Sequence, residues 1–367
     1  MKKSIEVEYW VIDRDGELTT PDSLTELSSH VEGEFVEPLY EIKTEPCETI
    51  DELRREFVGR LSVVLDEAHE RDLLLVPLGT PIDGGEIDRL PDERSRIQER
   101  VIGENFRYTK HCAGTHVHFE QRNVADQLNA LIALDPAFAL LNTSPYFRGE
   151  RIADGARSHV YRKRGYEQYP KHGQLWEYTE SVGQWERRLE RRFEEFTQAA
   201  VEAGIAADSV DAHFTPDDVV WTPVRLRSTF PTVEWRSPDA ARPSQILALV
   251  REMSAIMDRL HDSVVSIRDG AARDDDRVGW MGSDEFVLPS FEDVSSLVDD
   301  AIHDGMGSDR LAAYLDRMGF DVAAYAPIAH EIELDSELAV AEARRLRLQY
   351  ARRLETDIRQ KTASRSD

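Results

Sequence analysis

The sequence predicts an α+β fold in which one sheet is built from short, widely separated strands. Segments that alternate apolar and polar residues are divided by long amphipathic helices and irregular stretches, not by tight hairpin turns alone. No repeat of fixed period and no Gly/Ser-rich linker divides the chain. The predicted strands cover 4–12, 38–44, 73–78, 114–120, 219–226 and 230–236.

The helices are predicted from apolar residues at helical spacing and from signals at their ends. The first begins after Thr49, which forms a capping box with the glutamate three residues later. A second begins near Val124, and Asp135-Pro136 predicts an N-cap and a first-turn proline that restart it. A third begins after Ser181. Further helices are expected near 243–266, 292–303, 308–318 and 335–358.

Charge excludes several classes of protein. The chain has 367 residues, with 45 basic and 71 acidic side chains and a net charge of −26. Nucleic acids and anionic membranes bind to basic surfaces, so a protein with this acidic excess is not expected to have either as a partner. Only 7 of the basic residues are lysines, which leaves 45 − 7 = 38 arginines. Many carboxylates with few lysines favour the high-salt cytoplasm of a halophilic archaeon over an ordinary acidic protein, because molar salt shortens the screening length to about 3 Å.

Cysteine content and the N-terminal sequence indicate a cytoplasmic protein. The two cysteines, Cys47 and Cys112, are too few for a disulfide framework in a chain of this length. The first residues place acids where a signal peptide needs apolar residues. The sequence contains no run of about 18 apolar residues, so no membrane span is predicted.

Four predicted strands carry chemically capable side chains at positions i and i+2, which share one face of a strand. These pairs are Glu6 and Glu8, Glu41 and Lys43, His116 and His118, and Glu234 and Arg236. The residues between them are apolar and are expected on the opposite face: Val7, Ile42, Val117 and Trp235. A solvated sheet face also alternates, but it usually mixes Thr, Lys and Ser rather than repeating Glu and His.

Gathering carboxylates on one face is unfavourable unless cations neutralise them, so the pattern favours a site for more than one metal ion. Mainly carboxylate ligands with histidine suit Mg²⁺ or Mn²⁺. Zinc is the competing interpretation, because His111, Cys112, His116 and His118 are close in sequence. The chain has no P-loop, no G-x-G-x-x-G motif and no G-x-S-x-G elbow.

Six motifs in a fixed order resemble the glutamate–cysteine ligase family and related carboxylate–amine ligases. The motifs lie at 4–8, 39–44, 78–81, 112–118, 142–147 and 232–239. The resemblance implies a glutamine synthetase-like catalytic fold, with a curved, mostly antiparallel sheet and helices on its outer face. It predicts one catalytic domain over 1–358, with a motif-bearing core at 4–260 and a C-terminal helical part at 261–358, followed by a flexible tail at 359–367.

The resemblance also implies a reaction: ATP phosphorylates a carboxylate, typically the γ-carboxylate of glutamate, and an amine such as cysteine displaces phosphate. The expected partners are therefore small molecules, and self-association is left open. The implied metal ligands are Glu6, Glu8, Glu41, His116 and Glu234. The implied nucleotide contacts are His116, His118 and Arg236, and the implied catalytic groups are Arg236 and Glu41. Arg157 and Arg162 are candidates for the substrate's α-carboxylate.

Some positions depart from the family pattern. Many relatives have three consecutive glutamates in the first motif, whereas this chain has Val7 between two glutamates and Tyr9 after them. Lys43 and Glu45 replace small polar residues expected after the second strand. Because of these departures, a non-catalytic homologue that binds a metabolite stays open as an alternative to a ligase. A zinc or cupin-like metalloenzyme built on the His116 and His118 strand is the other alternative.

Overall fold

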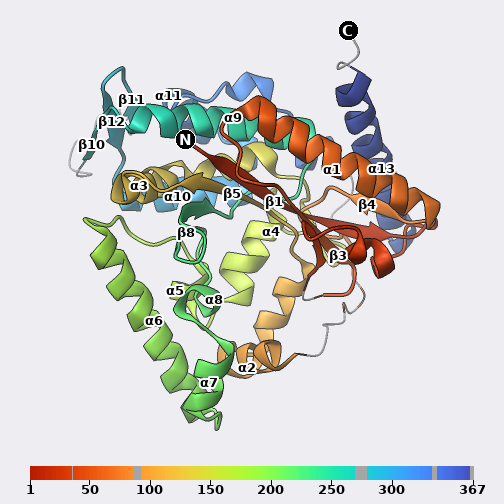
Figure 1. The fold of residues 1–367 in the computed structure, drawn as a ribbon, viewed down its shortest axis with the longest axis horizontal. Coiled ribbons are helices and arrows are strands. Elements are labelled where there is room, and N and C mark those ends of the chain that lie inside the picture. Colours follow the sequence, from red (N-terminus) through yellow and green to blue (C-terminus); the bar gives the residue numbers. More distant parts are fainter. Residues whose placement is uncertain are drawn as a thin grey trace.

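A seven-stranded sheet runs through the middle of the molecule in the computed structural model (Figure 1). The structure describes residues 1–363 except 35, 84, 86, 88–91, 269–278 and 333–336. The strand order is β2-β3-β1-β5-β9-β8, with β4 also on β1, and every pair is antiparallel. The strands are β1 (Lys3–Ile12), β2 (Val31–Gly33), β3 (Leu39–Lys43), β4 (Leu74–Val76), β5 (Thr115–Glu120), β8 (Val224–Arg227) and β9 (Thr232–Trp235).

Three helices cover one face of this sheet: α1 (Ile50–Glu70), α3 (Val124–Leu134) and α9 (Pro243–Leu260). The capping box at Thr49 is present, as predicted. The four apolar residues predicted between the polar pairs are fully buried on this side, so the prediction of one apolar face is confirmed. Burying apolar area under helices supplies most of the stabilisation of such a layered core.

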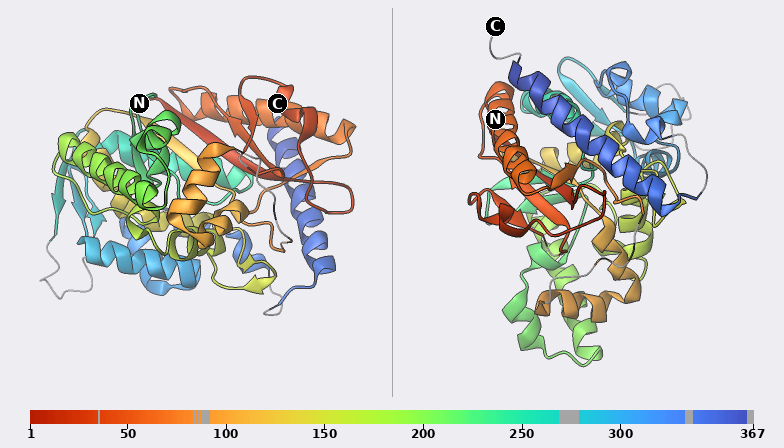
Figure 2. Two further views of the ribbon diagram at one scale, coloured as in Figure 1. Left: turned by 90° about the horizontal axis from the view of Figure 1, so that it is seen from below. Right: turned by 90° about the vertical axis from the view of Figure 1, so that its right-hand side faces the viewer.

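The remaining elements surround the sheet or project from it (Figure 2). The other helices are α2 (Glu93–Ile102), α4 (Ala156–His159), α5 (Pro170–Gly173), α6 (Val182–Glu202), α7 (Ala207–His213), α8 (Pro216–Val219), α10 (Phe291–His303), α11 (Asp309–Arg317), α12 (Ile328–Glu331) and α13 (Val340–Ala363). Short 3-10 helices lie at Asp22–Glu26, Glu104–His111, Asp135–Leu141, Gly305–Gly307 and Val322–Ala324, and a π-helical segment lies at Val160–Gly165. A two-stranded ribbon joins β6 (Tyr146–Phe147) and β7 (Glu150–Arg151).

The predicted helix at 243–266 is too long. It ends at Leu260, and β10 (Val264–Ile267) begins a small sheet with β12 (Glu285–Leu288) and β11 (Trp280–Met281). The β-branched residues Val264, Val265 and Ile267 favour a strand over a continued helix. The C-terminal helix α13 runs beside α1 and β4 and continues to Ala363, into the segment predicted as a tail. Residues 364–367 lie outside the described residues.

Asp135 does not cap the helix that follows it, which corrects the prediction. The segment Asp135–Leu141 is a 3-10 helix without a side-chain cap. The carboxylate instead accepts hydrogen bonds from Arg162, Trp235 and Ser237. The apolar segment Val124–Leu141, which contains this turn, is long and apolar enough to cross a membrane by composition, but 83% of it is buried inside the protein. Burial explains its apolar composition without a membrane.

Candidate active site

The strand register places the predicted polar residues side by side on the face opposite α1 and α9. Glu8 lies opposite Glu41, and Glu6 lies opposite His116 on one neighbouring strand. His118 lies opposite Glu234. Side chains of directly opposed residues have Cβ atoms about 4.5–5.5 Å apart, so the register itself brings these groups together. We call Glu6, Glu8, Glu41, His116, His118 and Glu234 the carboxylate–imidazole cluster.

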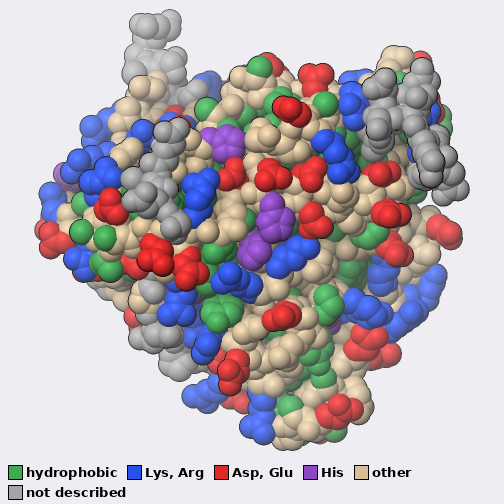
Figure 3. All heavy atoms as spheres, turned by 180° about the vertical axis from the view of Figure 1, so that it is seen from behind, with side chains coloured by type: hydrophobic (Ala, Val, Ile, Leu, Met, Phe, Trp, Pro, Cys, Tyr) green, Lys and Arg blue, Asp and Glu red, His purple; other side chains and the backbone are tan. Residues whose placement is uncertain are grey.

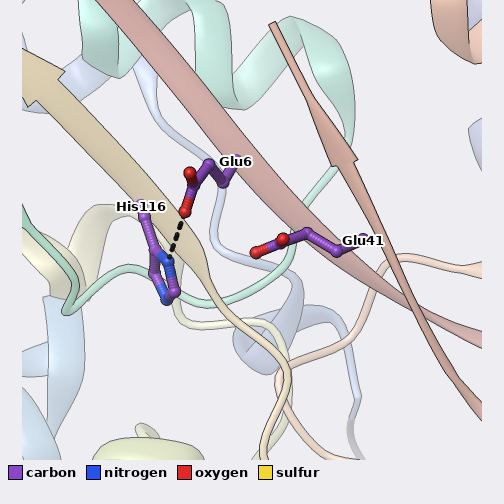
Figure 4. A group of neighbouring side chains, drawn as sticks. All are labelled: Glu6, Glu41 and His116. Atoms are coloured by element: carbon purple, nitrogen blue, oxygen red, sulfur yellow. Dashed lines mark hydrogen bonds and ion pairs between the residues drawn. The ribbon is translucent and has the colours of Figure 1, made fainter. Parts of the chain in front are cut away.

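The cluster can hold metal ions in more than one place. One group joins Glu6, Glu41 and His116 (Figure 4), and a second joins Glu6 to His118 and Glu234. A third group combines Glu8 and Glu41 with Glu34, a residue that the sequence analysis did not select. In each group the ligand atoms lie within 4.8 Å of one another. Because Glu6 and Glu41 each belong to two groups, adjacent cations could share their carboxylates.

Two buried atoms in the cluster make no hydrogen bond, although one of them also forms an ion pair with Arg236. Nε2 of His118 and Oε1 of Glu234 make no hydrogen bond to any described residue. They lie 4.0 Å apart, and Oε2 of Glu6 lies 3.6 Å from the same His118 nitrogen. A buried polar atom without a partner is unfavourable, and such atoms in native proteins often face an ion or a water. The donor set of two carboxylates and one imidazole therefore fits Mg²⁺ or Mn²⁺.

The pKa values of two carboxyl groups in the cluster, Glu41 and Glu6, are shifted in opposite directions. Burial and the neighbouring charges of Glu34, Glu6 and Glu8 raise the pKa of Glu41 well above its usual range, against the opposing charge of Lys43. Burial also acts to raise the pKa of Glu6, but the neighbouring imidazoles of His116 and His118 outweigh it and lower the pKa. A divalent cation would let all of the carboxylates ionise together.

Three arginines surround the deepest carboxylate of the cluster, Glu234, which has no solvent exposure. Nε and Nη2 of Arg225 both lie 2.8 Å from its Oε2. Nη1 of Arg227 lies 3.6 Å from Oε2, and Nε of Arg236 lies 3.2 Å from Oε1. Burial alone would raise the pKa of Glu234, but the charges of Arg225, His118 and Arg236 hold it below its usual range. Oε2 of Glu234 is thus paired with Arg225 and Arg227, while Oε1 lies between Arg236 and the imidazoles of the cluster.

Sequence reasoning missed Arg225 and Arg227, although a signal was present. The segment Val224-Arg225-Leu226-Arg227 has the same i, i+2 spacing as the pairs that were selected. The register places Arg225 directly opposite Glu234. Strand alternation could have found both arginines, but only pairing in the sheet identifies their partner.

Arg236, predicted as a phosphate contact, lies against an aromatic stack. Its guanidinium carbon lies 5.1 Å from the centre of the Trp221 ring, and Tyr161 stacks on Trp221 with a centroid separation of 3.9 Å. A cation beside an aromatic face is attracted by the ring quadrupole. Glu234 and Trp221 together fix the direction of the Arg236 side chain.

Arg157 and Arg162 are buried, with 3% and 2% exposure. Nη1 of Arg157 donates to the carbonyl of Ser237 at 3.0 Å. A Cβ atom at Gly114 would lie 2.0 Å from Nη2 of Arg157, so only glycine leaves room for the guanidinium of Arg157. Arg162 forms a buried ion pair with Asp135, 2.7 Å from Nη1 to Oδ2. Both arginines therefore contact the segment that follows β9, and their predicted contact with a substrate carboxylate stays a prediction.

The motifs at 78–81, 142–147 and 232–239 meet in one buried hydrogen-bond network. Asp239 accepts hydrogen bonds from the backbone and hydroxyl of Thr143. The hydroxyl of Thr143 lies 2.7 Å from the Gly79 nitrogen, and Thr80 contacts Ser144 through their hydroxyls. A Cβ atom at Gly79 would lie 2.4 Å from the Asp239 carboxylate. These motifs thus hold together the ends of the strands that carry the cluster.

Buried acids are confined to this region. Among the described residues, only five acidic residues are buried: Glu8, Glu41, Asp135, Glu234 and Asp239. Three belong to the cluster; of the other two, Asp135 accepts a hydrogen bond from Ser237, next to Arg236, and the Asp239 carboxylate accepts hydrogen bonds from Thr143. Elsewhere, acidic and basic side chains are interspersed over the surface shown in Figure 3. The acidic excess is therefore largely a surface property that is separate from the cluster.

The zinc interpretation brings together residues that the fold separates. His111 packs edge-on against Phe147, with ring centroids 5.2 Å apart. Cys112 is buried with Phe147 and Val160 in a small apolar cluster. No candidate metal group in the described part of the chain joins either residue to His116 or His118. The four residues are close in sequence, but they do not form one site.

The fold is that of known ligase structures. A glutamate–cysteine ligase from Francisella tularensis, solved in complex with AMP, matches with a TM-score of 0.54 and 15% identity, covering 100% of this chain and 93% of that one. A bifunctional glutathione synthetase from Pasteurella multocida matches with a TM-score of 0.57 and 15% identity, covering 97% of this chain and 52% of that one. The predicted α+β fold, with its antiparallel sheet and outer helices, is thereby confirmed.

Family membership follows from the sequence. Residues 8–278 match the model of glutamate-cysteine ligase family 2, and the chain belongs to this family. A protein of Rhodococcus jostii named "Putative glutamate--cysteine ligase 2-1" is 27% identical over 256 residues, which cover 67% of this chain and 63% of that protein. The match thus spans less than two thirds of this curated relative.

Proposed function

We propose that this protein is an ATP-dependent carboxylate–amine ligase that joins glutamate and cysteine to form γ-glutamylcysteine. The observation that carries the proposal is the buried pair of His118 Nε2 and Glu234 Oε1, which make no hydrogen bond and lie within a face that gathers four carboxylates. Family membership and the shared fold support the same class of reaction.

The residues of the cluster would hold Mg²⁺ or Mn²⁺. Glu6, Glu8, Glu41 and Glu234 supply oxygen ligands, and His116 supplies a nitrogen 3.3 Å from Glu6 Oε2. When bound, the cation neutralises ATP phosphates and the charge that develops on the transferred phosphoryl group. His118, 3.6 Å from the same Glu6 oxygen, completes the second ligand group.

The proposed ligase reaction has two steps. A γ-carboxylate oxygen of glutamate bonds to the terminal phosphorus of ATP, and ADP leaves with the electrons of the broken P–O bond. The amine nitrogen of cysteine then bonds to the acyl carbon, phosphate leaves, and the amine gives up a proton. Arg236, held by Glu234 and Trp221, is the group suited to the transferred phosphate because its guanidinium forms paired, charge-assisted hydrogen bonds.

One observation favours the non-catalytic alternative. Nζ of Lys43 lies 2.8 Å from Oε2 of Glu41, which places a protein cation beside a carboxylate proposed to hold a metal. Glu32 also pairs with this ammonium group. Tyr9 gives no such support, because it lies on the helix-covered face and its hydroxyl donates to the carbonyl of Ala241 at 3.2 Å. The departure at Tyr9 therefore removes no group from the cluster.

A turnover assay tests the proposal. The protein is incubated in concentrated KCl with ATP, Mg²⁺, glutamate and a panel of amines that includes cysteine, and phosphate release and amide products are followed. We expect phosphate release that depends on both the acid and the amine, with γ-glutamylcysteine as the product. Absence of turnover with every acid and amine would contradict the ligase, and a different amide would contradict the assignment of cysteine alone.

A further inference from the structure

A pocket lies away from the carboxylate–imidazole cluster. It has a volume of about 470 Å³ and lies between α5, the loop that leads to α6, α6 itself and the first residue of α10. Pockets for small ligands have volumes of about 300–1,000 Å³. None of these elements contributes a residue to the cluster, and α5 and α6 lie in the part of the molecule that projects below the sheet in Figure 1.

The charge of this pocket is opposite to that of the protein. Four basic residues line it, Lys171, Arg188, Arg191 and Arg192, against one acid, Glu177. The whole chain has a net charge of −26. A concave basic site on an acidic protein concentrates anions locally, while the rest of the surface repels them.

Two of the four cations are engaged by the protein, and two are not. Arg188 donates to the carbonyls of Glu177 and Tyr178, at 2.6 and 3.2 Å. Arg192 pairs with Glu195, 2.5 Å from Nη1 to Oε2. The side chains of Lys171 and Arg191 are exposed and make no hydrogen bond or ion pair with any other described residue. The pocket therefore retains two positive charges for a ligand.

The remaining walls are apolar and held in place. Leu175, Trp176 and Phe291 line the pocket. The indole N–H of Trp176 donates to the carbonyl of Lys171 at 2.7 Å, so the aromatic wall is tied to the residue that carries one free charge. Arg188 lies over the same indole, 5.6 Å from its centroid. An apolar wall beside two free cations is complementary to an anion that carries an apolar group.

We propose that this pocket binds an organic phosphate with a small apolar or aromatic body. Arg191 and Lys171 contact the phosphate, since guanidinium and ammonium groups both bind phosphate oxygens through charge-assisted hydrogen bonds. Leu175 and Phe291 contact the apolar body. The site is independent of the proposed ligase chemistry, because it shares no residue with it.

Isothermal titration calorimetry with phenyl phosphate tests the proposal. The full chain is used at the lowest KCl concentration at which circular dichroism shows it folded, because salt screens the attraction. We expect one binding site, at least about tenfold weaker in the Lys171→Glu/Arg191→Glu double variant. Arg251→Glu, an exposed charge reversal on α9, is the matched control and should stay within about twofold of the original protein. If the double variant does not fold, Arg191→Ala alone should still weaken binding.

Two further titrations locate the ligand and define its chemistry. Phenyl phosphate should bind Arg236→Ala as well as it binds the original protein, since Arg236 belongs to the other site; loss of binding there would overturn the proposal. Inorganic phosphate should bind more weakly than phenyl phosphate, and equal affinity would overturn the role of the apolar wall. Equal affinity of the double variant and Arg251→Glu, or no binding by the original protein, would overturn the pocket itself.

Discussion

Oε1 of Glu234 lies 4.0 Å from Nε2 of His118 in the interior of the protein, and neither atom has a hydrogen-bond partner among the described residues. The other oxygen of Glu234 is held by both nitrogens of the Arg225 fork. Glu234 thus has one oxygen fixed by Arg225, while its other oxygen lies 3.2 Å from Nε of Arg236 and also faces Glu6 and His118. This asymmetry is what a carboxylate needs in order to be rigid and still ligate a metal.

Replacing Glu6 by glutamine should weaken cation binding without unfolding the protein. Glu6 belongs to two of the three candidate metal groups, and its side chain is 26% exposed, so its loss leaves no deeply buried charge. We expect Mn²⁺ affinity to fall at least about tenfold, because even groups that only support a ligand are worth about 10–100-fold. Mn²⁺ titration followed by electron paramagnetic resonance measures the change.

Glu120→Gln is the matched control for this substitution. Glu120 is on the same strand face as His116 and His118, but it pairs with Arg122 and belongs to no candidate metal group in the described residues. Mn²⁺ affinity should be unchanged in this variant. An equal loss of Mn²⁺ affinity in both variants would mean that Mn²⁺ binding depends only on the net charge of this sheet face.

Arg225 and Arg227 should differ sharply in their effect on stability. Removing Arg225 leaves the fully buried Glu234 without its closest cation, and such a loss destabilises proteins by about 3–5 kcal/mol. Arg227 lies 3.6 Å from the same carboxylate but is 24% exposed, so its ion pair is worth about 0–1 kcal/mol. Urea unfolding of Arg225→Met and Arg227→Met at constant KCl measures both free energies. A similar small loss in the two variants would contradict the assigned role of Arg225.

The cluster could be predicted from the sequence because it rests on strand alternation, which is local. Glu6 and Glu8 share a face wherever β1 pairs, and Val7 between them must face the helices. The role of Asp135 could not be predicted in this way. Its position before a proline has the form of an N-cap, yet its partners Arg162 and Trp235 are 27 and 100 residues away in sequence. Only the packing of the 3-10 helix against β9 selects these partners over a local cap.

The difference between local patterns and pairing of distant segments also explains the position of Tyr9 and the small second sheet. A third acid of the first motif would fall at Tyr9, but strand alternation turns Tyr9 away from Glu8 into the apolar core. The helix predicted over 243–266 was extended past Leu260 because local spacing does not reveal that β12, more than twenty residues later, pairs with β10. Register between distant strands carries the information that single-segment patterns lack.

Lys43→Met should strengthen cation binding at Glu41. The Lys43 ammonium group lies 2.8 Å from Glu41 Oε2 and thus competes with a metal for this oxygen. Methionine retains much of the apolar stem without the charge. We expect tighter Mn²⁺ binding in the same titration, with Lys43→Arg as the control that keeps the charge and should bind no more tightly than the original protein. Weaker binding in Lys43→Met would instead indicate that Lys43 stabilises the arrangement of the carboxylates.

His111 should make the protein sensitive to acid. Burial first, and then the charges of Arg148 and Lys110, lower the pKa of His111 from 6.5 to about 4. The unfolded chain binds this proton at a higher pH than the folded protein, so the stabilisation is fully present above pH 6.5 and is lost as the pH falls toward 4.

The pKa difference of His111 between the unfolded and folded states corresponds to about 3 kcal/mol of unfolding free energy. In urea unfolding between pH 7 and 4, the stability of the original protein relative to His111→Leu should therefore fall as the pH falls, whatever constant packing difference separates the two proteins at pH 7. His261→Leu, at an exposed position after α9, should run parallel to the original protein over the same range. Parallel curves for His111→Leu would show that His111 takes up its proton equally in the folded and unfolded states.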